Sequence, residues 1–148
     1  MKEKFQLDSI RLTAILLALA GAVDSAYLAF LKFTGAVAAC GDIGDCEAVN
    51  NSKYAEIGGI PLALLGLLGY LAILAFIVLE TRFPGWREGL HLGVFGLTLA
   101  GTIYSAYLTY IEIAVLQAIC PYCVVSAVVM LLLFMISIVR LRRLSFVD

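Results

Sequence analysis

Four long apolar runs, separated by short charged clusters, decide what this sequence can fold into. Hydrophobic residues make up 63% of the 148 residues and charged residues only 14%, far from the composition of an ordinary soluble domain. Each run approaches the ~20 residues that a helix needs to cross a bilayer. The predicted helices cover residues 10–33, 60–79, 90–116 and 122–139. The sequence therefore predicts an all-α membrane protein built as a bundle of four transmembrane helices.

The predicted helices leave little chain for anything else. The longest connection, an outer loop of residues 34–59, is too short to hold a soluble domain of ordinary size. We therefore expect a single membrane domain over residues 1–148. Within the loop, Val49, Tyr54 and Ile57 occur among polar residues, a pattern that fits a short helix or turn lying over the bundle as a lid.

Lys and Arg residues are distributed unevenly between the two sides of the predicted bundle. With the N-terminus in the cytoplasm, eight of the ten lie on the cytoplasmic side, as membrane proteins prefer. The eight are Lys2, Lys4, Arg11, Arg82, Arg87, Arg140, Arg142 and Arg143, and the two outside are Lys32 and Lys53. We expect a multi-pass protein of the cell membrane with both termini cytoplasmic. The net charge of -1 gives no indication of nucleic-acid binding.

An internal repeat places the cysteines. Residues 17–30 align with residues 97–110 at an offset of 80, with eight of fourteen positions identical, and the same offset carries Cys40 onto Cys120. The chain therefore consists of two repeated helical hairpins whose first helices run in the same direction. Both cysteines are expected at one membrane face, on the extracytoplasmic side, where disulfides form and persist.

Cys120 and Cys123 form a CxxC motif at the start of the predicted fourth helix. Pro121 suits the first helical turn, where its missing N–H is not needed. Unpaired N–H groups and the positive end of the helix dipole favour a thiolate there, particularly at Cys123. A CxxC motif is typical of a redox-active pair, but it also occurs as half of a zinc site or as a structural disulfide.

Cys40 and Cys46 supply a second pair, on a loop in which two glycines allow the chain to bend. Because thiol–disulfide exchange passes through a mixed disulfide, two pairs within reach of each other can hand electrons along in sequence. Two alternatives stay open from these residues alone. The four thiolates can hold a metal ion such as zinc, or two inert disulfides can staple the loops of a structural or adaptor membrane protein.

Asp24 is the carboxyl group that we place deep in an apolar run, and an intramembrane acid is a candidate functional residue. It either relays protons or makes a hydrogen bond to Ser25, Ser105 or Tyr104 across a helix interface, and we prefer the structural interpretation. His91, the only histidine, is predicted at a helix interface remote from the cysteines.

These motifs together resemble the vitamin K epoxide reductase family, including its prokaryotic disulfide-forming members. The resemblance covers nearly the whole chain. It rests on the five-residue spacing of the loop cysteines, on Ser52 six positions later, on Gly-Ile-Pro at residues 59–61 opening the second helix, and on the Cys-Pro-Tyr-Cys motif. It implies a quinone-linked thiol oxidoreductase that promotes disulfide formation, with ubiquinone, menaquinone or a related quinone enclosed by the four helices and no metal.

The resemblance also implies roles for single residues. Cys40 and Cys46 would exchange with a thioredoxin-like partner, a disulfide between Cys46 and Cys120 would link the two pairs during turnover, and Cys123 would face the quinone ring. The quinone-contact candidates are Ser52, Tyr54 and Ser126, of which the family pattern supports Ser52 and only its position in the loop supports Tyr54.

Two departures from the family pattern limit what the resemblance implies. Vertebrate members have a tyrosine four residues after the second CxxC cysteine, where this chain has Ala127, so epoxide substrates and anticoagulant binding do not transfer. Many bacterial members continue into a fused thioredoxin domain, whereas this sequence ends at Asp148. We therefore expect a separate thioredoxin-like protein of the DsbA type as dithiol partner, with the quinone pool of the bilayer as electron acceptor.

Overall fold

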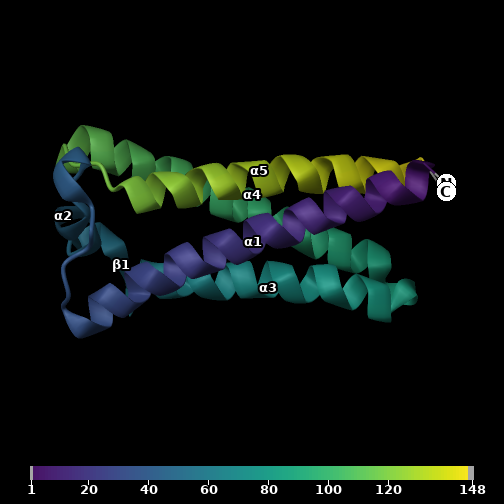
Figure 1. The fold of residues 1–148 in the computed structure, drawn as a ribbon, viewed down its shortest axis with the longest axis horizontal. Coiled ribbons are helices and arrows are strands. Elements are labelled where there is room, and N and C mark those ends of the chain that lie inside the picture. The colour runs from purple at the N-terminus through teal and green to yellow at the C-terminus, as the bar shows by residue number, and fades with distance from the viewer. Residues whose placement is uncertain (1, 147–148) are drawn as a thin grey trace.

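The computed structural model describes residues 2–146, which fold into a bundle of four long helices (Figure 1). These helices are α1 (Lys2–Thr34), α3 (Leu62–Arg82), α4 (Arg87–Ile111) and α5 (Pro121–Ser145). All four are long and apolar enough to cross a membrane. The predicted all-α membrane bundle is confirmed.

The four helices form a ring in which each packs against two neighbours. α1 packs against α3 and α5, and α4 packs against the same two helices. The start of α1 and the end of α5 lie at one end of the bundle, whereas α2 (Cys46–Asn50) and the short strand β1 (Glu56–Ile57) lie at the other (Figure 1). The first helices of the two hairpins, α1 and α4, therefore run in the same direction, as the repeat predicts.

The first and last helices, α1 and α5, are longer than the apolar runs from which they were predicted. α1 begins at Lys2 rather than at residue 10, and α5 continues to Ser145 rather than ending at residue 139. In both cases polar residues extend a helix whose apolar part has already ended. Hydrophobicity marks the part of a helix that fits the bilayer, and it does not mark where the backbone hydrogen bonding stops.

The second helix begins at Leu62, not at residue 60, because the chain first makes a tight hairpin. β1 pairs antiparallel with β2 (Ile60–Pro61). Gly58 and Gly59 both have positive φ angles, of 59° and 83°, a conformation that glycine adopts without steric cost. The Gly-Ile-Pro segment therefore belongs to this hairpin.

The loop between α1 and α3 carries the predicted short helix. It contains the 3-10 helix η1 (Gly41–Ile43), then α2, then the 3-10 helix η2 (Lys53–Ala55). A further 3-10 helix, η3 (Pro84–Trp86), joins α3 to α4. The predicted third helix, over residues 90–116, is in fact divided: α4 ends at Ile111 and a π-helix, η4 (Glu112–Leu116), follows it.

Glycines at matching positions of the repeat admit large side chains from neighbouring helices. A Cβ atom on Gly21 of α1 would lie 2.3 Å from the ring of Tyr70 on α3, and one on Gly101 of α4 would lie 2.8 Å from the sulfur of Met130 on α5. Tyr70 is fully buried. Its ring thus reaches the centre of the bundle because α1 has no side chain at position 21.

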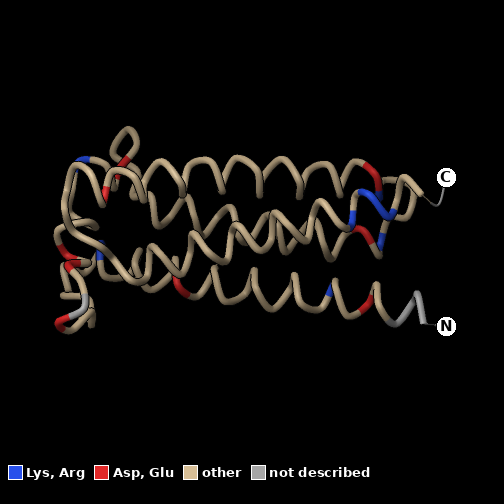
Figure 2. The backbone as a smooth tube through the Cα atoms, turned by 90° about the horizontal axis from the view of Figure 1, so that it is seen from above, with Lys and Arg blue, Asp and Glu red and all other residues tan. Residues whose placement is uncertain are grey.

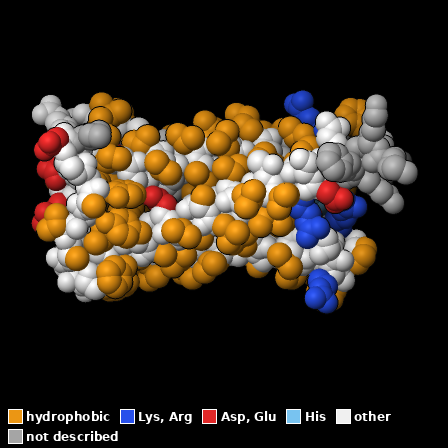
Figure 3. All heavy atoms as spheres, viewed as in Figure 1, with side chains coloured by type: hydrophobic (Ala, Val, Ile, Leu, Met, Phe, Trp, Pro, Cys, Tyr) orange, Lys and Arg blue, Asp and Glu red, His pale blue; other side chains and the backbone are white. Residues whose placement is uncertain are grey.

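The surface has the charge pattern of a bilayer-spanning bundle. Charged residues gather at the two ends, and the middle of the chain trace is almost free of them (Figure 2). On the face shown in Figure 3, hydrophobic side chains cover the middle, Lys and Arg lie near the end where α5 finishes, and acidic side chains lie at the loop end.

A buried cluster of ionisable side chains joins all four helices at the end remote from the loop. Arg140 of α5 donates a hydrogen bond to Glu80 of α3. His91 Nε2 of α4 lies 3.3 Å from Glu80 Oε2, and Arg11 Nε of α1 lies 3.8 Å from Glu80 Oε1. Glu80, His91 and Arg140 are all buried. His91 therefore lies at a helix interface far from the cysteines, as predicted.

Candidate redox site

The four cysteines are present as one disulfide and one dithiol. Cys40 and Cys46 are joined in a disulfide whose Cα atoms lie 6.2 Å apart. Cys120 and Cys123 are free thiols. The structure thus represents a form in which the outer pair is oxidised and the CxxC pair is reduced.

Both pairs lie in one side-chain cluster at the loop end of the bundle. Cys46 and Cys120 are buried together with Val49, and Cys40 and Cys123 pack against them. Cys40 is only partly buried, whereas Cys46 and Cys120 have 1% and 0% of their surface exposed. The inner member of the disulfide and the first cysteine of the CxxC motif are therefore in the same solvent-free cluster.

The loop is held against the CxxC segment by direct contacts. The N–H of Asp45 donates to the carbonyl oxygen of Ile119 at 3.0 Å, and the hydroxyl of Tyr122 donates to the carbonyl oxygen of Ala39 at 3.3 Å. Gly44 lies so close that a Cβ atom on it would be 2.3 Å from the Ile119 oxygen. These contacts fix the two cysteine pairs side by side.

Cys120 is the N-cap residue of α5 and Pro121 is its first residue. The Cys123 side chain is hydrogen-bonded to the Cys120 sulfur, and this bond lowers the pKa of the Cys120 thiol below its usual value despite the opposing effect of burial. The sequence predicts the thiolate mainly at Cys123. The lowered pKa favours Cys120 instead, because the hydrogen bond from Cys123 stabilises a negative charge on Cys120.

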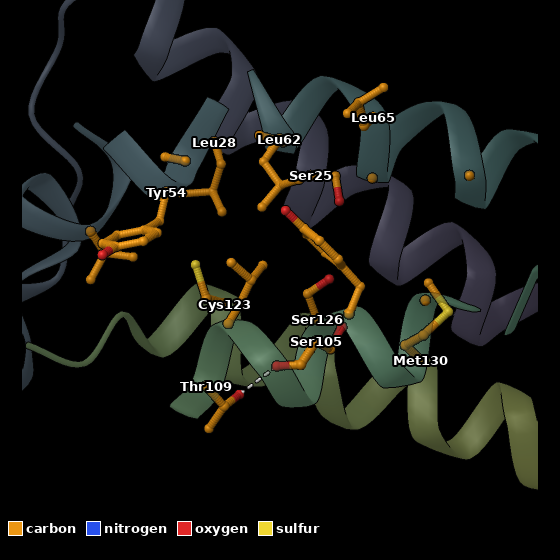
Figure 4. A pocket seen from close by; sticks show the side chains of 18 of the residues that line it. Ser25, Leu28, Tyr54, Leu62, Leu65, Ser105, Thr109, Cys123, Ser126 and Met130 are labelled. Carbon is orange, nitrogen blue, oxygen red and sulfur yellow. Dashed lines mark hydrogen bonds between the residues drawn. The ribbon is translucent and has the colours of Figure 1, made fainter. Parts of the chain in front are cut away.

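A cavity of about 460 Å³ lies between the four helices and below the loop. Most of its wall is apolar, with residues such as Leu28, Leu62, Leu97 and Met130. Cys123 is the one cysteine of the four on this wall. Its sulfur points into the space bordered by Leu28 and Tyr54 (Figure 4). An apolar molecule in this cavity would meet one sulfur, and that sulfur belongs to the reduced pair.

The structure brings the three quinone-contact candidates to the same cavity. Ser52 and Tyr54 reach it from the loop, and Ser126 reaches it from α5, one turn after Cys123. The Ser52 hydroxyl donates to the carbonyl oxygen of Val49 at 2.8 Å. The Ser126 hydroxyl lies 2.9 Å from the hydroxyl of Tyr70. Tyr70 is thus a polar group of the cavity that the sequence argument did not identify.

Asp24 also lines the cavity, from α1, which packs beside the CxxC helix α5. Its Oδ2 atom is buried and has no hydrogen-bond partner among residues 2–146. The predicted hydrogen bond from Ser25, Ser105 or Tyr104 is therefore not made to this oxygen. The structural interpretation that we preferred from the sequence is wrong for Oδ2.

Glu112 is a second carboxyl group on the cavity wall, and it is not among the residues predicted from the sequence. It begins the π-helix η4 and is only 4% exposed. Its Oε2 atom accepts a hydrogen bond from the backbone N–H of Cys120 at 3.2 Å. The signal in the sequence was an acid inside the apolar run of residues 90–116, eight positions before the CxxC motif.

The described part of the chain contains no group of three or more His, Cys, Asp and Glu side chains arranged to hold a metal ion. The thiols that could serve as ligands are instead divided between a disulfide and a hydrogen-bonded pair. The chemistry that this arrangement supports directly is thiol–disulfide exchange.

Comparisons with known proteins agree with this geometry. The chain is 36% identical over 122 residues to the thiol-disulfide oxidoreductase LTO1 of Arabidopsis thaliana, an alignment that covers 78% of this chain and 32% of that relative. The chain thus spans about a third of the length of the plant protein. The model of the Vitamin K epoxide reductase family matches residues 12–138, which include all four cysteines. The chain belongs to the vitamin K epoxide reductase family.

Proposed function

We propose that this protein is a membrane thiol oxidoreductase that takes electrons from a dithiol protein and delivers them to a quinone. One observation carries the proposal: both cysteine pairs share one cluster, and Cys123 alone among the four lies on the wall of an apolar cavity. This arrangement connects an aqueous reductant, which can reach the loop, with a lipid-soluble oxidant inside the bundle.

The cavity fits a quinone head group. Its volume of about 460 Å³ lies within the range of about 300–1,000 Å³ that is typical of small-molecule sites. The wall is mainly aliphatic, and the hydroxyl-bearing residues Ser52, Tyr54 and Ser126 are among those that line it. Apolar walls suit the ring and its substituents, while hydroxyls can donate hydrogen bonds to the two ring oxygens.

The first part of the reaction is thiol exchange at the loop. A thiolate of the partner attacks Cys40, the more exposed sulfur of the disulfide, and Cys46 leaves as a thiolate. The partner's second thiolate then attacks the partner sulfur bound to Cys40. This step releases Cys40 and leaves the partner oxidised, with its two electrons now on the Cys40 and Cys46 thiols.

The second part transfers these electrons to the CxxC pair. With Cys120 and Cys123 joined in a disulfide, the Cys46 thiolate attacks the Cys120 sulfur beside it, and Cys123 leaves. Cys40 then attacks Cys46, which re-forms the loop disulfide and frees Cys120. The product is the form that the structure represents, an oxidised loop and a reduced CxxC pair.

In the last part, Cys120 and Cys123 are oxidised to a disulfide by the quinone. The pair gives up two electrons and the two thiol protons. The electrons reduce the quinone ring and the protons bind to its two oxygens, so that the product is a hydroquinone. Asp24 on the cavity wall is proposed to relay protons in this step, because its buried Oδ2 has no hydrogen-bond partner in residues 2–146 that would hold it in a structural role.

We propose that the protein lies in the cell membrane with its cysteines on the extracytoplasmic side. The support is the concentration of Lys and Arg at the end of the bundle opposite the cysteines. The proposed partner is a thioredoxin-like protein of the DsbA type. Its reoxidation would allow it to form disulfides in further proteins outside the cytoplasm.

Quinone reduction by the purified protein tests the proposal. The protein is mixed with a reduced thioredoxin-like donor and with ubiquinone or menaquinone, and the Cys123→Ser variant is compared with the wild type. We expect the variant to lose turnover entirely while its Cys40–Cys46 disulfide still exchanges with the donor. Equal rates of quinone reduction in the two proteins would exclude the mechanism.

A further inference from the structure

The end of α4 is rebuilt around the side chain of Glu112. The helix widens into the π-helix η4, and Gln117 follows it in a left-handed conformation with φ of 51°. The N–H of Ala118 donates to the carbonyl oxygen of Glu112 at 3.1 Å. The chain thus turns back at once, so that Cys120 arrives beside the Glu112 carboxyl group. Short π-helical turns of this kind are frequent at functional sites.

Glu112 touches both members of the CxxC pair. Its Oε2 atom accepts the N–H of Cys120 at 3.2 Å, and its carboxyl group also interacts with the Cys123 side chain. Both Glu112 and Cys123 line the cavity. A proton that leaves the Cys123 sulfur therefore has a carboxylate as its immediate neighbour, on the same wall from which a quinone would accept it.

The carboxyl group has no cationic partner in the described part of the chain. The ion pairs found in residues 6–146 all involve Glu80 or Glu56, and the cavity wall holds neither Lys nor Arg. A buried carboxyl group without a counter-ion is expensive inside a membrane protein and marks a functional position. The titratable groups that surround Glu112 across the cavity and the cysteine cluster are Asp24, Tyr54, Tyr70, Tyr104, Tyr122, Cys120 and Cys123.

We infer that Glu112 is the proton acceptor for the CxxC thiols during quinone reduction. This inference rests on the proposed function and assigns its proton-transfer residue. With Cys120 as the thiolate, Glu112 takes the remaining thiol proton from Cys123 and passes it to a quinone oxygen, which returns Glu112 to the carboxylate. The proton that Cys120 gave up reaches the second oxygen through Asp24 as the Cys120–Cys123 disulfide closes. Two thiols and one quinone become one disulfide and one hydroquinone, so that atoms and electrons balance.

The Glu112→Gln variant separates proton transfer from structure, because the amide oxygen can still accept the Cys120 N–H but cannot take up a proton. The test uses the full chain with Cys40 and Cys46 replaced by serine, so that the CxxC pair is the only redox couple. The pair is reduced with dithiothreitol, and quinone reduction is followed in a single turnover by ultraviolet absorbance between about pH 6 and about pH 8.

We expect E112Q to reduce quinone roughly 10²-fold to 10⁴-fold more slowly than the parent protein, the usual contribution of a general base. Its rate should rise about tenfold per pH unit, because hydroxide must replace the carboxylate. The parent rate should change little over the same range. In the chain with its natural cysteines, E112Q should exchange its loop disulfide with reduced thioredoxin at the wild-type rate.

Control variants make each outcome decisive. Glu47→Gln removes an exposed carboxyl group from α2 at the same end of the bundle and should behave like the parent. If E112Q fails to fold, the Glu112→Asp variant is measured in its place, because it keeps a carboxylate base. It should reduce quinone more slowly than the parent protein, with an unchanged pH profile. Parent-like kinetics in E112Q, or equal loss of quinone reduction and loop exchange, would overturn the role of Glu112. A parent protein that reduces no quinone would instead refute the proposed function.

Discussion

At the scale of single residues, a substitution of Asp24 separates an effect on the stability of the fold from an effect on proton transfer. A carboxyl group in the interior of a membrane protein weakens the fold unless hydrogen bonds or a cation compensate it. Asp24 Oδ2 is buried without a hydrogen-bond partner among the described residues. The Asp24→Asn substitution removes the ionisable group and breaks no hydrogen bond to that oxygen. Its effect on stability should therefore be small and favourable, whereas a relay would lose its proton carrier.

We expect Asp24→Asn to unfold at the same or a higher denaturant concentration than the wild type, and to reduce quinone at least about tenfold more slowly. Thermal or chemical unfolding in detergent and steady-state quinone reduction check the two halves of the prediction. Asp42→Asn, which changes an exposed acid of η1, is the control and should alter neither. Unchanged quinone reduction in Asp24→Asn would end the relay proposal.

The sequence predicted residues whose chemistry is rare, and it missed those whose chemistry depends on their neighbours. Cysteines in a CxxC motif and an acid in an apolar run stand out without a structure. Glu112 was missed although it also lies in an apolar run, because an acid near the end of a predicted helix normally reaches solvent, whereas here it is buried at the start of η4. Tyr70 was equally hidden, since its place in the cavity depends on the absence of a side chain at Gly21 on another helix.

At the scale of elements, the contact between the loop and the CxxC segment controls electron transfer between the two pairs. Gly44 is the closest point of that contact, and its φ of -168° is extended backbone that any residue adopts. A substitution of Gly44 therefore causes no backbone strain, and its effect comes only from the volume of the added side chain. A Cβ atom would lie 2.3 Å from the Ile119 carbonyl oxygen and 2.8 Å from the ring of Pro121, so the loop must move away from Cys120.

We expect Gly44→Ala to slow the complete reaction, from donor to quinone, by about tenfold to about a hundredfold, as small displacements of reacting groups commonly do. The two partial reactions should persist: the loop disulfide should still exchange with the donor, and a CxxC pair reduced in advance should still reduce quinone. Stopped-flow measurement of all three rates checks the prediction. Gly96→Ala, with open space around the added methyl group, is the control. Wild-type overall turnover in Gly44→Ala would show that this contact does not limit electron transfer.

Element bounds were less predictable than element number, for a physical reason. Four apolar runs and an 80-residue repeat were sufficient for the order and direction of the helices. They could not show that residues 60–61 form a strand, because the positive φ angles of Gly58 and Gly59 belong to a hairpin formed by pairing with Glu56 and Ile57. The spacing of apolar residues indicates which positions are buried. Such turns depend instead on backbone hydrogen bonds, which cannot be inferred from a hydropathy pattern.

At the scale of the whole molecule, the two ends of the bundle are held by different means. The cysteine end is closed by a loop, a disulfide and a few backbone hydrogen bonds. The opposite end is closed by Glu80, whose carboxyl group interacts with Arg11, His91 and Arg140, so that each of the four helices contributes one side chain. Glu80 is the only carboxylate in this described cluster, and its loss leaves the buried guanidinium of Arg140 without a counter-charge.

We expect Glu80→Gln to destabilise the bundle by about 3–5 kcal/mol, the usual result of removing one partner from a buried ion pair. Because the cluster lies at the far end from the cysteines, the rates of loop exchange and quinone reduction per folded molecule should stay at their wild-type values. Unfolding in mixed detergent micelles gives the stability, and the same samples give both rates.

Glu88→Gln changes an exposed acid in the first turn of α4 and should have little effect. Wild-type stability in Glu80→Gln would show that the four helices do not depend on this carboxylate. Loss of quinone reduction in folded Glu80→Gln would show instead that the two ends of the bundle are coupled.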